Sequence, residues 1–503
     1  MTTTPTPARA GRREWTALTV LMLPLLLVSM DVSVLYFAVP AINADLAPTG
    51  TQQLWIFDIY AFVLAGLLMT MGSLGDRIGR RRLLLFGAAA FGVASLAAAY
   101  ADSAVALIAA RAALGIGGAT LMPSTMALVR TMFTDPRQRA QAIGVWTAVM
   151  TGGVALGSVM SGVLVEFFWW GSVFLVNLPA MALLLVLGPV LLPESRDPSP
   201  GRFDLLSVPL SMAAVLPLIH GLKEFASDGP RAEQGLFVGT GLLFGVLFAW
   251  RQRTAASPMI PRGLFRSRGF GPAVALNAVS ALGMMGSSFF TTQYLQSVLG
   301  MSALEAALWS LVPSLPIGAT APAATALVHR GVPRVHVVTA GFLIAAGGFA
   351  LLSAPGTDSL VLLLVAAGVL ACGIVLVMSQ MTDLALGAAP VEKAGSASSL
   401  LETGAEFGGA LGMAVLGSVG TAVYRDRIPD AAPEAARETL GGALAVAAEL
   451  PGRAGEALTQ AARVAFTEGM HAAALTAAAV LVVAAVVAAA TLRGIGVRST
   501  GEG

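Results

Sequence analysis

Charged residues are scarce in this chain. Asp, Glu, Lys and Arg together make up 12% of its 503 residues, whereas a water-soluble domain has about 25%. Hydrophobic residues make up 56%. A soluble protein of this length needs more polar surface, so the composition predicts a protein that crosses a membrane many times.

Lysine, histidine and cysteine are also rare, and each shortage excludes a class of site. Neither of the two lysines, Lys223 and Lys393, is followed by Ser or Thr, so the G-x4-G-K-[ST] loop of an ATP-driven pump is absent. The four histidines have no metal-ligand spacing, and the single cysteine, Cys372, has no internal disulfide partner. We expect no enzyme activity, no cofactor, no metal and no nucleic-acid partner.

Long apolar runs dominate what is present, and each is long enough to cross the hydrocarbon core as a helix of about 20 residues. The sequence predicts fourteen such spans. They lie at about 16–40, 54–72, 83–101, 104–129, 140–165, 170–192, 204–222, 235–251, 270–296, 305–328, 336–354, 359–386, 396–423 and 470–492.

The basic residues predict the orientation of these spans. Most of the 30 Lys and Arg residues lie in the N-terminal tail 1–15, in the C-terminal tail 493–503 and in the loops that an even count places on the same side. Several loops on the opposite side contain none. The positive-inside rule therefore predicts that both termini are cytoplasmic, in the cytoplasmic membrane of a bacterium.

The spans fall into two groups of six, at 16–193 and 270–492, separated by two shorter spans at 204–252. A duplicated transporter with an inserted helix pair has this arrangement. The external segment 424–469 has a different composition, because Pro433 and Pro451 each precede an Ala-rich amphipathic stretch. It predicts two short helices, which either form a hairpin over the outer mouth or rest on the membrane surface.

Four motifs give the chain a resemblance to a known family. The turn after the second span reads G-x-L-x-D-R-x-G-R from Gly72, with Asp76, Arg77, Gly79 and Arg80. It resembles the loop motif of the major facilitator superfamily. The stretches WIFDIY in span 2, MDVSVLYFAVP in span 1 and ETGAEFG in span 13 are similar to those of its fourteen-span drug–proton antiporters, the QacA, SmvA and LfrA type.

The resemblance implies two six-helix bundles and the export of cationic antiseptics and dyes. It also implies that the basic turn acts as a latch on the outward-open state; the alternative is that the turn only sets topology. Asp76 is expected to cap the third span. The antiporter motif of span 5 is met in part, because serines replace its proline and one glycine. Its positions here are Gly144, Gly153, Gly157, Ser158, Ser161 and Gly162.

Gly153, Gly157 and Ser161 recur every four residues, which predicts a close-packed ridge, placed here between the two halves. In span 4 the family pattern is met by Arg111 and Gly115.

Three charged residues lie inside the outer halves of spans 1, 2 and 4, where a charge costs several kcal/mol and needs a partner. They are Asp31, Asp58 and Arg111. We expect a polar cluster in which the arginine holds one carboxylate ionised and the other remains free to titrate. The alternative is a static ion pair that fixes helix packing.

Glu402 and Glu406 lie four residues apart on one face of span 13, with Glu406 near the bilayer midplane. Gly404, Gly408 and Gly412 form the opposite face, which predicts close packing on a neighbouring helix. A carboxyl group at this depth can carry a proton or neutralise a bound cation, but not both at once. This exclusion is the physical basis of antiport.

A cavity for lipophilic cations also needs aromatic and thioether walls. Six residues could form such walls, or could instead be ordinary packing residues: Trp146, Met284, Met285, Phe289, Phe290 and Tyr294.

These observations together predict a monomeric antiporter that exports lipophilic cationic drugs, dyes and quaternary ammonium antiseptics in exchange for protons, and so confers multidrug resistance. The alternative is a proton-coupled carrier of an endogenous metabolite, lipid or siderophore.

Overall fold

The computed structural model describes residues 10–196, 204, 206–228, 232–255, 262–388, 394–429 and 431–493, and all regular structure in these residues is helical. Thirteen helical segments in this part of the chain are long and apolar enough to cross a membrane. The remaining predicted span, at 204–222, corresponds to a shorter apolar helix at Ser207–Gly221. Thirteen of the fourteen predicted spans therefore each overlap one of these segments.

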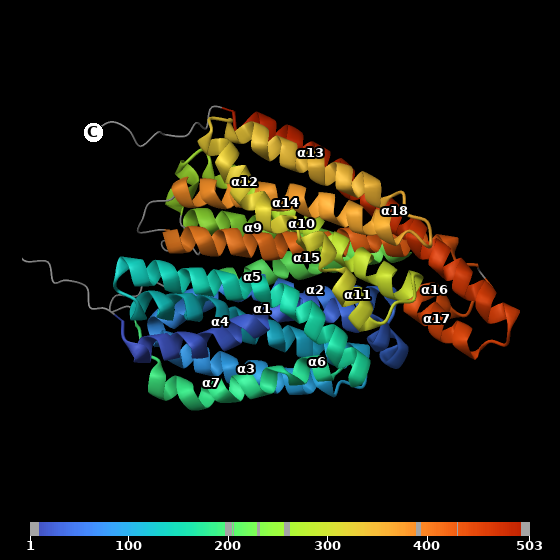
Figure 1. Cartoon of the computed structure of the whole chain (residues 1–503), viewed down its shortest axis with the longest axis horizontal. Coiled ribbons are helices and arrows are strands. Elements are labelled where there is room, and N and C mark those ends of the chain that lie inside the picture. Colours follow the sequence, from blue (N-terminus) through green and yellow to red (C-terminus); the bar gives the residue numbers. More distant parts are fainter. Residues whose placement is uncertain are drawn as a thin grey trace, which may run out of the picture.

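The first group of spans forms one bundle (Figure 1). Its helices are α1 (Arg12–Leu46), α2 (Gly50–Ile78), α3 (Arg80–Ala99), α4 (Ala104–Met132), α5 (Pro136–Phe167), α6 (Ser172–Leu175) and α7 (Asn177–Leu191). The inserted pair is α8 (Ser207–Asp228) and α9 (Ala232–Thr254), followed by the short turn η1 (Arg262–Arg266).

The second group forms the other bundle, which lies beside the first in Figure 1. Its elements are α10 (Phe270–Gln293), η2 (Tyr294–Val298), α11 (Ala303–Trp309), η3 (Val312–Ser314), α12 (Ile317–His329), α13 (Arg334–Leu352), α14 (Leu360–Ala388), α15 (Ala394–Arg427), α16 (Glu434–Glu438), α17 (Leu440–Glu449) and α18 (Arg453–Thr491). We call the end of the molecule that carries α16 and α17 the hairpin end. The opposite end, with the turn at Gly79, is the basic end.

The tenth predicted span is broken into three pieces. Helix α11 ends at Trp309, the turn η3 contains Pro313, and α12 begins after Pro316. Proline removes a backbone donor and clashes with the preceding turn, which explains both interruptions.

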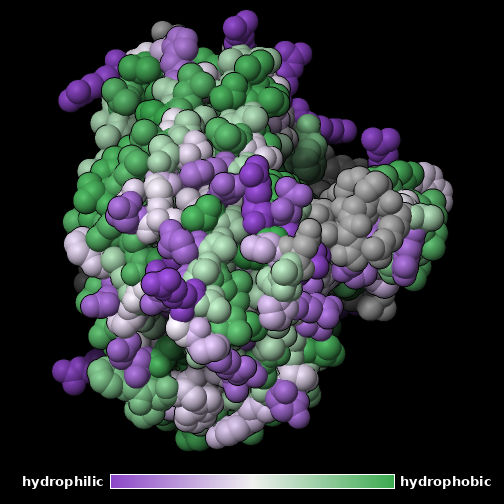
Figure 2. Space-filling view, turned by 90° about the vertical axis from the view of Figure 1, so that its right-hand side faces the viewer, coloured by the Kyte–Doolittle hydropathy of each residue, from purple (hydrophilic) through white to green (hydrophobic). Residues whose placement is uncertain are grey.

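The segment 424–469 differs from its prediction. The stretch after Pro433 divides into α16 and α17 at Thr439, whose side chain accepts from the Gly442 amide and caps α17. The second predicted helix is not separate, because α18 runs without a break from Arg453 into the last span. Figure 2 looks onto this end of the molecule, where hydrophilic residues gather across the middle of the face.

A polar clasp joins α8 to α9 at the basic end. Arg251 donates to Asp204 Oδ1 from Nε at 2.8 Å and from Nη2 at 2.5 Å, and Gln252 donates to Ser207 Oγ at 2.7 Å. Desolvation raises the pKa of Asp204, but the hydrogen bonds from Arg251 and Ser207 outweigh it, so the pKa is lowered from its ordinary value. The clasp holds Asp204 in its ionised form.

Candidate functional site

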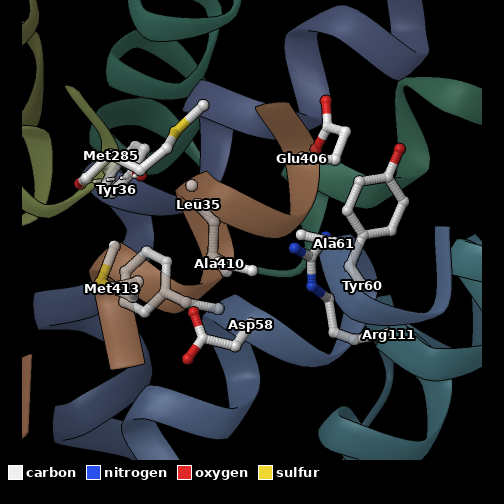
Figure 3. A pocket seen from close by; sticks show the side chains of 12 residues that line it. Leu35, Tyr36, Asp58, Tyr60, Ala61, Arg111, Met285, Glu406, Ala410 and Met413 are labelled. Carbon is white, nitrogen blue, oxygen red and sulfur yellow. Dashed lines mark hydrogen bonds between the residues drawn. The ribbon is translucent and has the colours of Figure 1, made fainter. Parts of the chain in front are cut away.

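A cavity of about 50 Å³ lies between the two bundles, at the level of the buried acids. Figure 3 shows its labelled side chains, with Asp58 from α2, Arg111 from α4 and Glu406 from α15. The lining residues are Leu35, Tyr36, Phe57, Asp58, Tyr60, Ala61, Arg111, Met285, Glu406, Gly409, Ala410 and Met413. Acids predicted on separate halves of the sequence therefore face one space.

Arg111 is held on three sides. Its Nη1 donates to Asp31 Oδ2 at 2.5 Å, its Nε donates to the Ile56 carbonyl at 3.1 Å, and its guanidinium lies 4.7 Å from the centre of the Tyr60 ring. The side chains of Arg111 and Asp31 are 3% and 2% exposed. Each member of this buried pair is therefore the other's counter-ion.

Asp58 is buried like Asp31, but the two carboxylates lie in different places. Asp58 lines the cavity together with Arg111 and Glu406, whereas Asp31 does not line it. The arrangement divides the expected cluster into an ion pair, Asp31 with Arg111, and a carboxyl group that borders the cavity.

Glu402 and Glu406 differ in position. Glu406 lines the cavity, and Glu402 lies one turn nearer the basic end, outside the lining. Glu402 Oε1 is buried and has no hydrogen-bond partner among the described residues.

The opposite face of α15 packs as predicted. Added methyl groups at Gly404, Gly408 and Gly412 would meet Val274, Ala278 and Leu282 of α10. The predicted close packing of the glycine face on a neighbouring helix is therefore confirmed.

Two tyrosines belong to the site and were not assigned to it from sequence. Tyr60 stacks under Arg111, and the Tyr36 hydroxyl lies 3.4 Å from Met285 Sδ across the boundary between the bundles. Both stand in the stretches that carry the resemblance, within five residues of Asp31 or Asp58. Their closeness in sequence to the two buried aspartates could have identified them as residues of the site.

The six predicted wall residues are scattered. Met285 lines the cavity, and Phe289 makes an edge contact, at 5.4 Å between ring centres, with the lining residue Phe57. The others lie elsewhere: Met284 is partly buried, Phe290 faces Phe466, Trp146 donates to Thr125 Oγ1, and the Tyr294 hydroxyl donates to the Gly356 carbonyl.

The ridge on α5 does not lie between the halves as predicted. Gly153 and Gly157 pack against the α1 backbone at Leu26 and Met30, and Ser161 Oγ donates to the Val34 carbonyl at 2.6 Å. The prediction was wrong because this face of α5 is buried inside the first bundle, against α1.

The other positions of the span 5 motif differ from the ridge. Ser158 donates to the Val154 carbonyl of its own helix. Gly162 faces α11 of the other half, whereas Gly144 has open space around it.

The basic turn is built on Gly79, whose φ of +110° strongly favours glycine. The segment that follows α7 holds it: Glu194 Oε1 accepts from the Arg81 amide at 3.1 Å, and the Ser195 carbonyl accepts from the Arg80 amide at 2.9 Å. Glu194 therefore satisfies an amide in the first turn of α3. The side chain of Asp76 lies outside the described structure, so its predicted capping role stays a prediction. Gly72 and Arg77 lie in the last turns of α2, before Gly79.

The cavity is too small for a drug in this conformation. A water molecule needs about 10–15 Å³ by the same kind of measure, so about 50 Å³ holds a few waters. A ligand pocket is typically about 300–1,000 Å³. A larger substrate would require the two bundles to move apart.

The Major Facilitator Superfamily sequence pattern matches residues 21–413. The chain belongs to this superfamily. It is a transporter rather than an enzyme, and it is 43% identical over 480 residues to "Multidrug efflux pump LfrA" of Mycolicibacterium smegmatis, covering 94% of this chain and 95% of that one.

A second relative is "Methyl viologen resistance protein SmvA" of Salmonella typhimurium, which is 34% identical over 90% of this chain and 93% of its own length. Among solved structures, a bacterial homologue of the human lysosomal transporter Spinster superposes with a TM-score of 0.68. Its identity is 18%, over 96% of this chain and 98% of that chain. This likeness supports the superfamily fold of two bundles.

Proposed function

We propose that this protein is a proton-coupled antiporter that exports lipophilic cationic drugs from bacteria. The observation that carries the proposal is the meeting of Asp58 and Glu406, one from each half, on the wall of a single cavity. Relatives named for multidrug efflux and methyl viologen resistance support export of such compounds.

The charges around the cavity favour a cationic cargo. Arg111 is neutralised by Asp31, so it adds little net positive charge, while Asp58 and Glu406 border the space. Phe57, Tyr36 and Met285 supply ring faces and a thioether, which suit flat organic cations. An anionic cargo would face carboxylates without a free cation in the described lining.

Exchange of a cation for protons then needs two conformations, one open to each side of the membrane, that use the same carboxyl groups. A cation entering from the cytoplasm or the inner leaflet displaces a proton from Glu406 or Asp58, because the same oxygens cannot hold both. After the bundles rock, protons from outside return to these groups and release the cation. Glu402, one turn nearer the basic end, provides a further carboxyl on the cytoplasmic approach.

The proposal places the basic end in the cytoplasm and the hairpin end outside, in accordance with the distribution of Lys and Arg. In this proposal the protein is a monomer with fourteen spans and both termini in the cytoplasm. The proton gradient drives transport, and no cofactor is needed. Exchange of a monovalent cation for one proton is electroneutral. Additional protons would use the membrane potential, at about 2.3 kcal/mol per charge per 100 mV.

Ethidium efflux from proteoliposomes under an imposed pH gradient tests the proposal. We expect gradient-driven efflux by the wild type and by Glu456→Gln, a matched change at an exposed glutamate. We expect Glu406→Gln to lose it. Efflux that is equally fast in Glu406→Gln would remove Glu406 from the coupling site, and no efflux by the wild type would favour an endogenous cargo.

A further inference from the structure

A second cavity lies at the basic end, between helices of the first bundle. Its volume is about 290 Å³, against about 50 Å³ for the central cavity. Its walls come from the first turn of α1, the last turn of α4 and the end of α7 with the residues after it. They consist of Arg13, Glu14, Thr131, Met132, Leu191 and Pro193. None of these residues lines the central cavity, so the proposed exchange of cations and protons gives this space no role.

One cation and one anion stand next to each other in the wall. Arg13 Nη2 donates to the Val190 carbonyl of α7 at 3.0 Å, and Glu14 Oε2 accepts from the Gly11 amide at 2.7 Å. Neighbouring residues on a helix point in different directions, so the two charges do not face each other. A guanidinium has five N–H donors and a carboxylate has about four acceptor positions. Each side chain therefore keeps the capacity to bind a ligand.

The rest of the wall is apolar apart from one hydroxyl group. Met132, Leu191 and Pro193 supply the apolar part. Thr131 supplies the hydroxyl, and its Oγ1 lies 3.3 Å from Ser195 Oγ, which joins α4 to the segment after α7 at this wall. A ligand that fills the cavity must therefore combine charged groups with an apolar part.

The cavity lies at the level of the membrane surface. Trp15 of α1 makes an edge contact with Phe133 at 5.0 Å between ring centres, and tryptophan is enriched where the hydrocarbon meets the headgroups. On α7, Val186 and Val190 are 69% and 68% exposed, and they form an apolar surface that faces lipid in a membrane protein. Arg13 is bonded to the Val190 carbonyl, so a phospholipid lying along α7 places its headgroup beside this arginine.

The two opposite charges select a zwitterionic headgroup. A phosphate binds a guanidinium through charge-assisted hydrogen bonds, but a headgroup that is only anionic also meets the carboxylate of Glu14. A primary ammonium supplies three N–H donors for this carboxylate and for Thr131 Oγ1, whereas a quaternary ammonium has none. Phosphoethanolamine carries a phosphate and a primary ammonium, and so matches both charged residues.

We propose that this cavity binds the phosphoethanolamine headgroup of a phospholipid of the inner leaflet, with the phosphate at Arg13 and the ammonium at Glu14. The proposal uses the proposed orientation, in which the basic end is cytoplasmic, and it is independent of the cargo. Pockets between transmembrane helices on the cytoplasmic side are common binding sites for lipid headgroups. The bound lipid links α1, α4 and α7 and so stabilises the first bundle.

Native mass spectrometry of the purified full chain measures its affinity for dioleoyl phosphatidylethanolamine, phosphatidylcholine and phosphatidylglycerol, each added in turn. We expect the ethanolamine lipid to bind about fivefold more tightly than the other two. Glu14→Gln should remove this preference. It should leave α1 intact, because glutamine at this position can still accept from the Gly11 amide.

Asp383→Asn is the matched control, because it makes the same carboxylate-to-amide change at an exposed residue of α14. It should keep the preference for the ethanolamine lipid. Equal affinities for the three lipids in the wild type, or a preference that survives in Glu14→Gln, would overturn the proposal.

A second variant tests the phosphate. Arg13→Gln should weaken the binding of all three lipids about fivefold, because each of them has a phosphate. Arg253→Gln, at an exposed arginine in the last turn of α9, should leave the affinities unchanged. Thermal unfolding establishes that each variant is folded. A folded Arg13→Gln with wild-type affinities would contradict the assignment of the phosphate.

Glycerophosphoethanolamine has the same headgroup without acyl chains, so it distinguishes a lipid from a cytoplasmic solute. We expect it to displace the ethanolamine lipid only in large excess, because the lipid also contacts the apolar surface of α7. Displacement at an equimolar concentration would overturn the assignment to a lipid. These measurements involve no transport, so a failure of the proposed antiport would not affect them.

Discussion

Arg111 and Asp31 illustrate how a membrane protein accommodates charge at the scale of single residues. The pair is almost fully buried, and the arginine also uses the Ile56 carbonyl and the Tyr60 ring. Removing one partner leaves a buried charge without its counter-ion, which costs far more than the pair contributes as a whole.

We expect Asp31→Asn and Arg111→Gln each to lower the free energy of unfolding by about 3–5 kcal/mol. The free energy of unfolding lost in the double variant should be smaller than the sum of the two single losses, because no buried charge is left without its counter-ion. Thermal or denaturant unfolding of the purified protein, analysed as a double-mutant cycle, measures this coupling. Additive losses would show that the pair is not a unit.

Charged residues in apolar runs were sufficient to locate the charged part of the site. Asp31, Asp58, Arg111 and Glu406 are conspicuous because any charge in a span is costly. The sequence could not show that Asp31 takes the arginine while Asp58 borders the cavity with Glu406. That division depends on the rotation and depth of α1, α2 and α4, which apolar patterning leaves undetermined.

At the scale of helices, close packing depends on where a glycine meets another backbone. Gly412 of α15 lies against Leu282 of α10, and a Cβ there would be 2.7 Å from Leu282 Cα. Gly347 of α13 is also helical but has open space around it. Substituting both glycines therefore distinguishes the effect of packing from the effect of helix propensity, because only Gly412 lies against another helix.

Gly412→Val should therefore destabilise the protein by about 1–3 kcal/mol through overpacking, while Gly347→Val should have little effect. The midpoint of thermal unfolding in detergent compares them. Similar midpoints for the two variants would contradict the close approach of α15 to α10.

The clasp between α8 and α9 predicts a pH dependence. Because hydrogen bonds lower the pKa of Asp204 below its ordinary value of 3.8, the clasp contributes stability above that value. The contribution is lost as the pH falls through the lowered pKa. Unfolding midpoints of the wild type and Asp204→Asn should thus differ at neutral pH and converge in acid; a constant difference would exclude this linkage.

Glycine spacing predicted the ridge on α15 correctly but led to a wrong neighbour for the ridge on α5. The α15 glycines pack on α10 as expected, whereas the α5 ridge packs on α1 of its own bundle. Both have the same four-residue period, and period identifies a close-packed face without identifying its neighbour. The break within the tenth span and the continuity of α18 likewise depended on local geometry that apolar runs do not encode.

At the scale of the whole molecule, the halves are joined from the hairpin end to the cavity. Glu438, the last residue of α16, accepts from the Gly50 amide of α2 at 2.9 Å and pairs with Arg425 of α15. Asn43 of α1 lies against Gly441 of α17, and Leu54 lies against Gly417. Transport by rocking requires these contacts to separate while the basic end closes.

The two-bundle architecture was predictable because apolar runs, basic loops and the superfamily motifs agree. The place of α8 was not, since the length of the inserted pair gives no information about which helices it packs against; α8 packs on α2 and α15. The contact of Met212 with α2 and those of Ile219 with α2 and α15 show this placement.

Proton release on substrate binding tests the central claim most directly. Ethidium is added to purified protein in lightly buffered solution over a range of pH, and the bound cation and released protons are both measured. The account predicts proton release by the wild type and by Glu456→Gln, less release by Glu406→Gln, and none when Asp58→Asn is added. Binding of ethidium by the wild type without proton release at any pH would contradict exchange in this cavity.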